Sequence, residues 1–339
     1  MTADSSSGTM RAAVITRPGG PEVLEVREVP RPRPQRHEVL VRVHASAINR
    51  ADLLQRMGRY PAPPGVPADI PGMEFAGTIA DAGEAANRWN RGQRVMGIIG
   101  GGAHAEYVTV NEDAIAAVPD LVAFQVAGAV PEVFMTAYDA LLQAGVKEGE
   151  YVLVHAAASG VGLAAIQLAK QMKAIPFGTT RSGAKTDAVV ASGAAAVFSL
   201  ATDQLDKLVA YGEQYTYGNG FDVVLDLVGG PYVAASLDCL ALKGRIVCIG
   251  TPAGNKAEIV LGTLLFKRAR VIGTVLRARS LEEKVAVTRS FTENVVPLLA
   301  SGKVNVTIDS EFPLERIADA HRRLESNETI GKVALRIAD

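Results

Sequence analysis

The sequence predicts an α/β protein of two domains, one β-rich and the other built on a doubly wound parallel sheet. The first observation is the length, because 339 residues correspond to about two domains at ~100–200 residues each. The second is a change of pattern near Pro131. Before it, short apolar stretches are broken by Gly and Pro; after it, continuous apolar runs alternate with helical segments. Strands that alternate with helices at this spacing indicate βαβ units and a parallel sheet.

The part of the chain before Pro131 is typical of strands joined by long connections. Strand patterns occur at 11–16 (RAAVIT), 23–29 (VLEVREV) and 39–49 (VLVRVHASAIN). The segment from Ala51 to Pro71 begins as a short helix and becomes a Pro-rich loop. In a compact domain, a loop of this length is either functional or mobile.

Beyond Pro131 the pattern predicts helices and strands buried on both faces. Helical spacing covers 131–145, and a second helix follows the small-residue turn at Ser159. The strands predicted for the parallel sheet are 151–157, 174–180, 221–230, 244–250 and 270–277. The tail from Leu281 holds one more helix and two strand-like segments, 304–312 and 331–337.

We assign this tail back to the first domain. The predicted division is a disordered tail at residues 1–9, a β-rich domain at 10–130 with 275–339, and a sheet domain at 131–274.

The composition excludes several classes of protein. With 35 Lys and Arg against 36 Asp and Glu, no excess positive charge favours a nucleic-acid backbone or an anionic membrane. The 2 cysteines, Cys239 and Cys248, lie in apolar surroundings that predict buried reduced thiols rather than a disulfide framework. No apolar run approaches the ~20 residues of a membrane helix, and the start MTADSSSGT lacks the apolar core of a signal sequence. We expect a cytoplasmic protein without a membrane or nucleic-acid partner.

A glycine loop gives the sharpest chemical signal. The buried strand predicted at 151–157 runs through small residues into Ser159, Gly160, Val161 and Gly162, where the helix begins. Glycines there let the backbone approach a pyrophosphate, and a helix N-terminus favours its negative charge. A plain packing turn is the alternative, but the further strands downstream favour a dinucleotide-binding domain.

The next strand indicates which dinucleotide is bound. NAD-binding versions carry an acid about 20 residues after the loop, which binds a ribose hydroxyl. Here Arg181, Ser182 and Lys185 follow the strand, and no acid occurs before Asp187. Two cations and a hydroxyl suit a 2′-phosphate, so we expect NADPH. A solvated basic turn is the alternative reading of these residues.

The sequence does not predict a catalytic zinc. Such a site needs three protein ligands and an open position. The cysteines lie in the sheet domain, and the 5 histidines are scattered at His37, His44, His104, His155 and His321. Without a Lewis acid, the favoured hydride acceptors are already electron-poor, such as quinones or conjugated carbonyls. No residue stands out as a general acid, so the proton can come from water.

The chain resembles the zinc-free quinone oxidoreductases, the zeta-crystallin-like branch of the medium-chain dehydrogenase/reductase superfamily. The resemblance runs from Met10 to Ile337 and is carried by ASAINRADLLQRMGRYPAPPG, IPGMEFAGTI, GGGAHAEYVTV, PEVFMTAYDAL, VHAAASGVGLAAIQLAK and IGKVAL. Zinc-dependent relatives have Gly-His-Glu where this chain has Gly72-Met73-Glu74. The resemblance implies a GroES-like catalytic domain beside a Rossmann domain, with the active site in the cleft between them.

The resemblance also implies roles for individual residues. Those expected near the nicotinamide and the substrate are Asn49, Tyr60, Thr136, Gly250 and Leu276. Those expected on the pyrophosphate and the 2′-phosphate are Ser159, Gly160, Val161, Ser182 and Lys185. Ser199 stands where the closest relatives have Tyr against the adenosine, and Arg181 where they commonly have Gly. From the residues alone, Asn49 is also explained as a turn residue, Tyr60 as a loop cover and Thr136 as a self-bonded helix residue.

Three functions fit these observations. The leading one is NADPH-dependent reduction of a quinone; the second is reduction of a conjugated enone, alkenal or enoyl double bond, with Tyr60 as the candidate proton donor. The third, implied by some zeta-crystallin-like proteins, is an NADPH-binding structural or RNA-binding protein. The family also implies a homodimer or a tetramer, assembled through edge strands of the Rossmann sheet.

Overall fold

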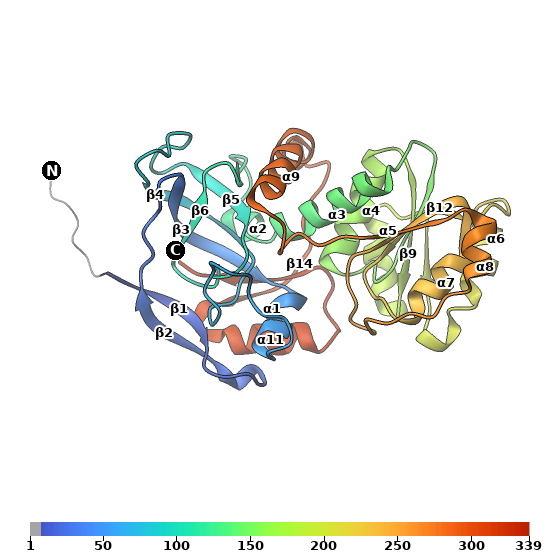
Figure 1. Ribbon diagram of the computed structural model, residues 1–339, viewed down its shortest axis with the longest axis horizontal. Helices are drawn as coiled ribbons and strands as arrows, with labels where there is room; N and C mark the ends of the chain where they lie inside the picture. Colours follow the sequence, from blue (N-terminus) through green and yellow to red (C-terminus); the bar gives the residue numbers. More distant parts are fainter. Residues whose placement is uncertain (1–7, 339) are drawn as a thin grey trace. The chain divides into compact units, whose positions relative to one another are not determined.

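Residues 8–338 are described by a computed structural model of the protein (Figure 1). The chain divides into two compact units. One consists of the residues up to Glu132 together with those from Arg277 onward, and the other of Val133–Leu276. We call them the first unit and the second unit, and each is described by itself.

The first unit is built on a seven-stranded sheet with the order β14-β15-β3-β4-β5-β7, in which β6 also pairs with β3. The strands are β3 (Glu38–Ile48), β4 (Glu74–Ala82), β5 (Arg94–Ile98), β6 (Tyr107–Asn111), β7 (Ile115–Ala117), β14 (Ile308–Pro313) and β15 (Lys332–Arg336). A separate hairpin joins β1 (Thr9–Ile15) to β2 (Leu24–Pro30). Apolar side chains such as Val41, Phe75 and Val333 form the core because strand alternation turns them to one face.

The helices of the first unit begin and end at recognisable signals. They are α1 (Arg50–Arg56), α2 (Phe124–Ala127), α9 (Leu281–Asn294), α10 (Val296–Ala300) and α11 (Ile317–Glu325). Ser280 and Glu283 form a capping box at the start of α9. The buried residues of α11, Ile317, Ala320, His321 and Leu324, recur every three or four positions and so form one apolar stripe.

The second unit contains a six-stranded parallel sheet with the order β10-β9-β8-β11-β12-β13. The strands are β8 (Tyr151–Val154), β9 (Ile175–Thr180), β10 (Ala196–Ser199), β11 (Phe221–Asp226), β12 (Leu240–Cys248) and β13 (Arg270–Gly273). Read along the chain this is the order 3-2-1-4-5-6, which defines the doubly wound dinucleotide-binding sheet. Its direction of winding reverses between β8 and β11, the point where such sheets bind ligands.

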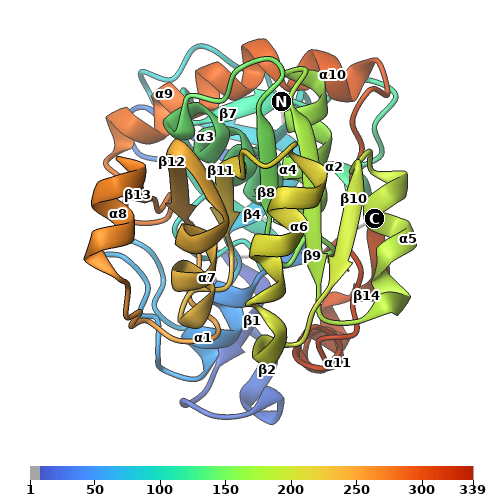
Figure 2. The same ribbon diagram turned by 90° about the vertical axis from the view of Figure 1, so that its right-hand side faces the viewer.

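Helices cover both faces of this sheet. They are α3 (Pro131–Ala144), α4 (Gly160–Gln171), α5 (Thr186–Ala191), α6 (Lys207–Tyr215), α7 (Pro231–Cys239) and α8 (Leu261–Lys267). The connection from β8 through α4 to β9 and the connection from β11 through α7 to β12 lead in opposite directions along the sheet. Because such crossovers are right-handed, α4 and α7 lie on opposite faces. Figure 2 shows α6 and α7 in front of the strands. An aromatic cluster of Phe177, Phe198 and Phe221 fills the core on the sheet.

The structure differs from the sequence-based expectation at several segment ends. β8 stops at Val154 rather than at residue 157, and β11 stops at Asp226 rather than at residue 230. β13 stops at Gly273 rather than at residue 277, because its only partner, β12, ends at Cys248, opposite Gly273. β14 begins at Ile308 rather than at residue 304, since its pairing with β15 starts there. Thr9 already belongs to β1, so the predicted end of the tail at residue 9 is wrong. Residues 1–7 of the predicted tail lie outside the described part of the chain.

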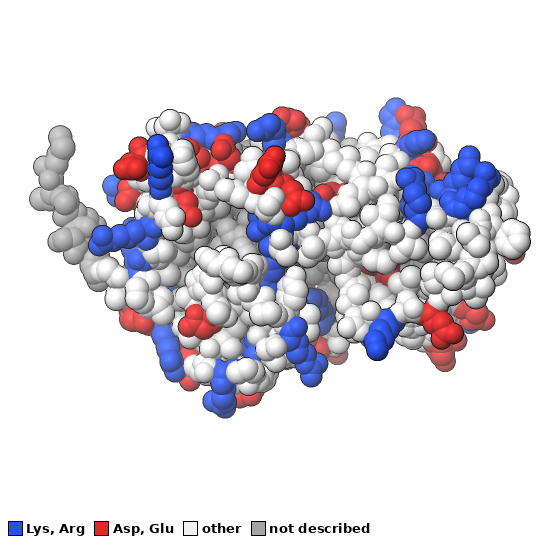
Figure 3. Space-filling view, in the orientation of Figure 1, with Lys and Arg blue, Asp and Glu red and all other residues white. Residues whose placement is uncertain are grey.

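Between Gly8 and Ala338, no helix combines the length and the apolar character required to cross a membrane. On the face shown in Figure 3, acidic and basic side chains are interspersed.

Candidate functional site

The candidate dinucleotide site of the second unit lies at the carboxyl edge of its parallel sheet. β8 ends at Val154, and a five-residue turn leads to Gly160, the first residue of α4. The Ser159 hydroxyl caps the helix by accepting a hydrogen bond from the Gly162 N–H at 3.1 Å. Because the first N–H groups of a helix have no partner within it, those of Gly160 and Val161 can receive an anion.

Close packing fixes the course of this turn. A Cβ on Gly162 would lie 2.6 Å from the carbonyl oxygen of Ala156, so only glycine lets α4 approach the turn this closely. His155 anchors the start of the turn, since its ring nitrogens bond the Thr179 and Ser236 hydroxyls, both at 2.9 Å. Burial lowers the pKa of His155 to about 3, so this histidine is neutral and structural.

The predicted phosphate residues follow the adjacent strand ends. Ser182 caps the short turn Gly183–Lys185 by accepting a hydrogen bond from the Ala184 N–H at 3.3 Å, while Arg181 and Ser182 are exposed. Ser199 ends β10 and pairs with Thr180 of β9, which places it beside the same edge. Open N–H groups, small residues and two cations therefore fit a nicotinamide dinucleotide at this edge.

The remaining predicted residues of the second unit lie on other elements. Gly250 follows β12, and its N–H donates to the Asp226 carbonyl oxygen at 3.4 Å. Thr136 on α3 and Leu276 after β13 are both buried. Asp226, which the sequence analysis missed, ends β11 at the switch point with its carboxylate fully buried. One of its oxygens accepts hydrogen bonds from the N–H groups of Val228 and Gly229, and burial raises its pKa.

Asn49 lies in the first unit, at the junction of β3 and α1. Its backbone N–H donates to the Asp52 carboxylate at 2.7 Å. The other oxygen of Asp52 accepts a hydrogen bond from the Gly72 N–H at 2.9 Å. Asp52 therefore fixes the backbone around Asn49 and is a structural carboxylate.

The side chain of Asn49 is held by an ion pair buried behind it. Its Nδ2 donates to Glu74 Oε1 at 3.0 Å, and its Oδ1 accepts from Lys332 Nζ at 2.5 Å. Lys332 also bonds Glu74 Oε1 at 2.8 Å and the Ile48 carbonyl oxygen at 3.2 Å. Lys332 is 4% exposed and Glu74 is fully buried, so this pair excludes water and sets the amide orientation.

Glu132 adds a third carboxyl group to this cluster. Its backbone N–H donates to Glu74 Oε2 at 2.9 Å, at the start of α3. Burial, together with the nearby charges of Glu74 and Asp52, raises the pKa of Glu132 to about 7, although Lys332 acts in the opposite direction. Neither Glu132 nor Lys332 is among the residues predicted from the sequence, where their only signals are their places in PEVFMTAYDAL and IGKVAL.

Tyr60 lies beyond α1 in the Pro-rich loop and is held by Arg277. The guanidinium carbon of Arg277 is 4.8 Å from the centre of the Tyr60 ring. Arg277 also donates to the Gly100 carbonyl oxygen at 2.7 Å and to Gln55 Oε1 at 2.5 Å. Arg277 is not among the residues predicted from the sequence. It is 222 positions from Gln55 in the chain, so no local pattern connects it with the loop that it holds.

The residues around Asn49 do not fit a zinc ion. Within residues 8–338, no group of three or more His, Cys, Asp or Glu side chains is placed to hold a metal. Met73 is buried and offers no ligand of the kind zinc prefers. Instead, the Lys332 ammonium lies among the oxygens of Glu74, Asn49 and Ile48.

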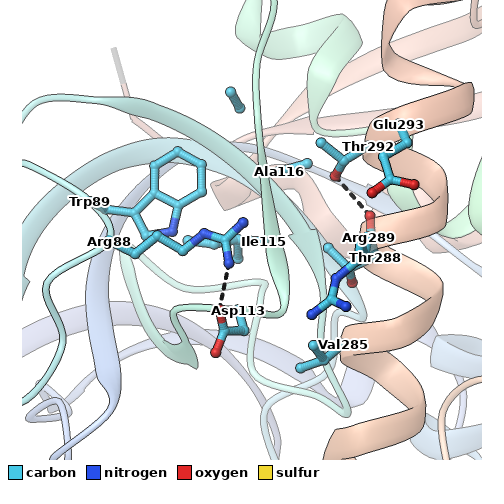
Figure 4. Close-up of a pocket in the computed structure, with 11 residues that line it drawn as sticks. Arg88, Trp89, Asp113, Ile115, Ala116, Val285, Thr288, Arg289, Thr292 and Glu293 are labelled. Carbon is cyan, nitrogen blue, oxygen red and sulfur yellow. Dashed lines mark hydrogen bonds and ion pairs between the residues drawn. The ribbon is translucent and has the colours of Figure 1, made fainter.

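A separate cavity of about 220 Å³ lies in the first unit beside α9, and none of the predicted site residues lines it (Figure 4). Trp89, Arg88 and Asp113 form one wall, and Thr288, Arg289 and Thr292 of α9 face them. Arg88 is paired with Asp113 at 2.6 Å.

Comparisons with known proteins agree with this architecture. The model of the alcohol dehydrogenase GroES-like domain matches residues 35–120, and that of a zinc-binding dehydrogenase matches residues 192–335. The quinone oxidoreductase of Homo sapiens is 31% identical over 335 residues, which cover 96% of this chain and 97% of that protein.

Two solved structures extend the comparison. The quinone oxidoreductase of Pseudomonas syringae pv. tomato DC3000 is 30% identical, with a TM-score of 0.85 over 97% of this chain and 100% of its own. A mycobacterial protein in complex with NADPH is 27% identical, with a TM-score of 0.85 over the same shares. The predicted fold class, a GroES-like unit with a Rossmann unit, is confirmed.

Proposed function

Because this chain belongs to the quinone oxidoreductases of the medium-chain dehydrogenase/reductase superfamily, we propose that it reduces a quinone with NADPH. The bound nicotinamide supplies the hydride, and the protein holds donor and acceptor in register. The observation that best supports this proposal is the buried arrangement of Asn49, Glu74 and Lys332. In it, Glu74 and Lys332 orient the Asn49 side chain without a set of metal ligands.

The preference for NADPH rests on the end of β9. Arg181 and Lys185 bring positive charge and Ser182 brings a hydroxyl, while the first acid of this segment is Asp187, on α5. A carboxylate that would bind an unmodified ribose is thus replaced by groups that attract a 2′-phosphate. On this basis Ser159, Gly160 and Val161 contact the pyrophosphate, Ser199 lies beside the adenosine, and Thr136, Gly250 and Leu276 border the nicotinamide.

The quinone is expected beside Asn49 and Tyr60. One N–H of Asn49 Nδ2 serves Glu74, whereas the other makes only a 3.4 Å contact with the Ala47 carbonyl oxygen. This weakly held N–H is available to a quinone oxygen. The Tyr60 ring, backed by the Arg277 guanidinium, offers a flat surface on which a quinone can stack.

The test is NADPH oxidation by the purified protein with an ortho-quinone, a short alkenal and a no-acceptor blank, and with NADH as the alternative donor. Turnover of the quinone with NADPH at a much higher kcat/KM than with NADH supports the proposal. Turnover of the alkenal alone would assign double-bond reduction instead. Binding of NADPH without turnover of either acceptor would reject an enzymatic role in both reactions.

We further propose that the protein forms a homodimer through the free edge of the second unit's sheet. β13 is the last strand of the sheet, and Leu265 and Phe266 of the preceding α8 are 74% and 87% exposed. An open strand edge beside exposed apolar residues suits pairing with a second copy of the chain. Light scattering of the wild type and of Phe266→Asp tests this, since a monomeric wild type would reject it. A cytoplasmic location stays a prediction, which cell fractionation checks.

A further inference from the structure

Quinone reduction by hydride needs a proton as well. A quinone that accepts a hydride becomes a hydroquinone monoanion, and one proton must then reach the second oxygen to give the hydroquinone. The donor loses two electrons and one proton as the hydride and leaves as the oxidised dinucleotide. A source for the remaining proton is therefore part of the reaction.

The cluster around Asn49 contains three carboxyl groups from three elements. Asp52 lies on α1, Glu74 on β4 and Glu132 on α3, and the one ammonium among them is that of Lys332 on β15. Their positions in the chain are far apart, so the fold itself brings these groups together.

Two of the carboxyl groups have both oxygens occupied by hydrogen bonds or an ion pair. Asp52 accepts one backbone N–H on each oxygen. Glu74 accepts hydrogen bonds from Asn49, Lys332 and the backbone of Glu132. Hydrogen bonds of this kind stabilise the charged form of a carboxyl group.

Glu132 is in a different position. Within the described part of the chain, its carboxyl group accepts no hydrogen bond and makes no ion pair, although its backbone N–H is bound to Glu74. It lies close enough to Glu74, Asp52 and the Lys332 ammonium to interact with all three electrostatically. An unpaired carboxyl beside two like charges retains its proton.

From this geometry we propose that Glu132 holds the proton that the second quinone oxygen takes up on reduction. The inference rests on the proposed quinone reduction. In this step the O–H bond of Glu132 breaks and an O–H bond forms on the hydroquinone monoanion, without further change in oxidation state. Because Glu132 is partly exposed, its carboxylate then regains a proton from solvent.

The placement on α3 agrees with this role. Glu132 and Thr136 are four residues apart on one helix, so their side chains project from the same face. Thr136 is expected beside the nicotinamide, and Asn49, expected beside the quinone, shares Glu74 with the Glu132 backbone.

The other titratable group next to the cluster is His104, and it does not fit the role. Burial lowers its pKa, with Lys332 acting in the same direction, so the ring is neutral at physiological pH. It is also fully buried, with Nε2 on the Ala47 carbonyl oxygen at 3.3 Å, and has no route for reprotonation from solvent.

The decisive variant is Glu132→Gln, which keeps the shape and the backbone bond to Glu74 but removes the exchangeable proton. With the ortho-quinone, we expect kcat to fall about 100-fold and to lose the inflection near pH 7 that the wild type shows. Glu132→Asp keeps a carboxyl group and should restore a pH-dependent kcat. Glu148→Gln is the matched control, because Glu148 is exposed and pairs only with Lys173 on the surface.

A second readout does not depend on turnover. In protein labelled with ¹³C at the glutamate carboxyl carbon, one resonance should titrate with a midpoint near pH 7 in the wild type and be missing from Glu132→Gln. If no carboxyl titrates above pH 6, or if Glu132→Gln keeps the wild-type kcat and pH profile, the inference is wrong. If the wild type reduces no quinone but the resonance titrates near pH 7, the proposed reaction fails while the proton-holding property stands.

Discussion

The two groups of candidate residues, one in each unit, are built in opposite ways. In the second unit, the residues proposed to bind the dinucleotide come from short stretches of sequence, 159–162 and 181–185, and the groups they offer are backbone N–H groups, the exposed Arg181 and the partly exposed Lys185. Around Asn49, the groups come from positions up to 283 residues apart and are buried side chains that bond one another. The first group depends on local chain geometry, and the second on the complete fold of its unit.

This difference predicts how each group responds to change. Loss of one exposed cation in the second unit weakens a screened interaction with the ligand. Loss of one member of the buried cluster leaves its partners uncompensated in a medium of low polarity. The largest effects of substitution should therefore be found around Asn49, and the smallest at the end of β9.

The largest effect is expected for Lys332→Met. Removal of the ammonium leaves the buried Glu74 carboxylate without its ion-pair partner. Breaking a buried ion pair in this way lowers the free energy of unfolding by about 3–5 kcal/mol. Urea unfolding at pH 7 should show this loss in the free energy of unfolding. The double variant Lys332→Met with Glu74→Gln should recover part of it, and a single variant as stable as the wild type would contradict the prediction.

Gly162→Ala tests the turn before α4, whose proposed binding groups are backbone N–H groups. The new Cβ would lie 2.6 Å from the Ala156 carbonyl oxygen, so α4 must shift and unfolding should become easier by about 3 kcal/mol. Gly183→Ala is the control, since nothing lies within 4 Å of its Cβ. Thermal denaturation of the two variants compares them directly, and equal midpoints would show that the close approach is unimportant.

The pH dependence of stability sharpens the comparison. A carboxyl whose folded-state pKa is raised to about 7 from 4.5 favours the folded state at low pH, and this contribution is lost as pH rises through about 7. Glu132→Gln should therefore be more stable than the wild type by about 3 kcal/mol at pH 8 and indistinguishable from it at pH 4. Unfolding curves at the two pH values check this, and a difference of the opposite sign would refute it.

The smallest effect is expected for Lys185→Ala, a partly exposed cation. The KM for NADPH should rise about tenfold and the KM for NADH should stay unchanged, because only the former carries the 2′-phosphate. Lys173→Ala, which removes a surface partner of Glu148, should change neither constant. An equal change for both donors would place Lys185 away from the phosphate.

The same contrast explains what could be predicted from the sequence. β8, the turn at Ser159 and α4 follow from local patterns of apolar and small residues, although β8 ends at Val154 rather than at residue 157. Asn49 and Tyr60 came only from the family resemblance. The pairing of Asn49 with Lys332, and of Tyr60 with Arg277, joins residues whose separation no local pattern records.

The ends of the strands were also predicted poorly from the sequence. An apolar run predicts that a strand exists, but where it stops depends on its neighbour. β13 shows this, since Gly273 is the last residue with a partner on β12.

The cation at the centre of the Asn49 cluster is part of the polypeptide. Lys332 is a residue of the chain itself, so its positive charge is in place as soon as the first unit folds. It cannot dissociate on dilution, be removed by a chelator or be exchanged for another ion. The orientation of Asn49 thus depends on neither the supply nor the selection of a metal by the cell.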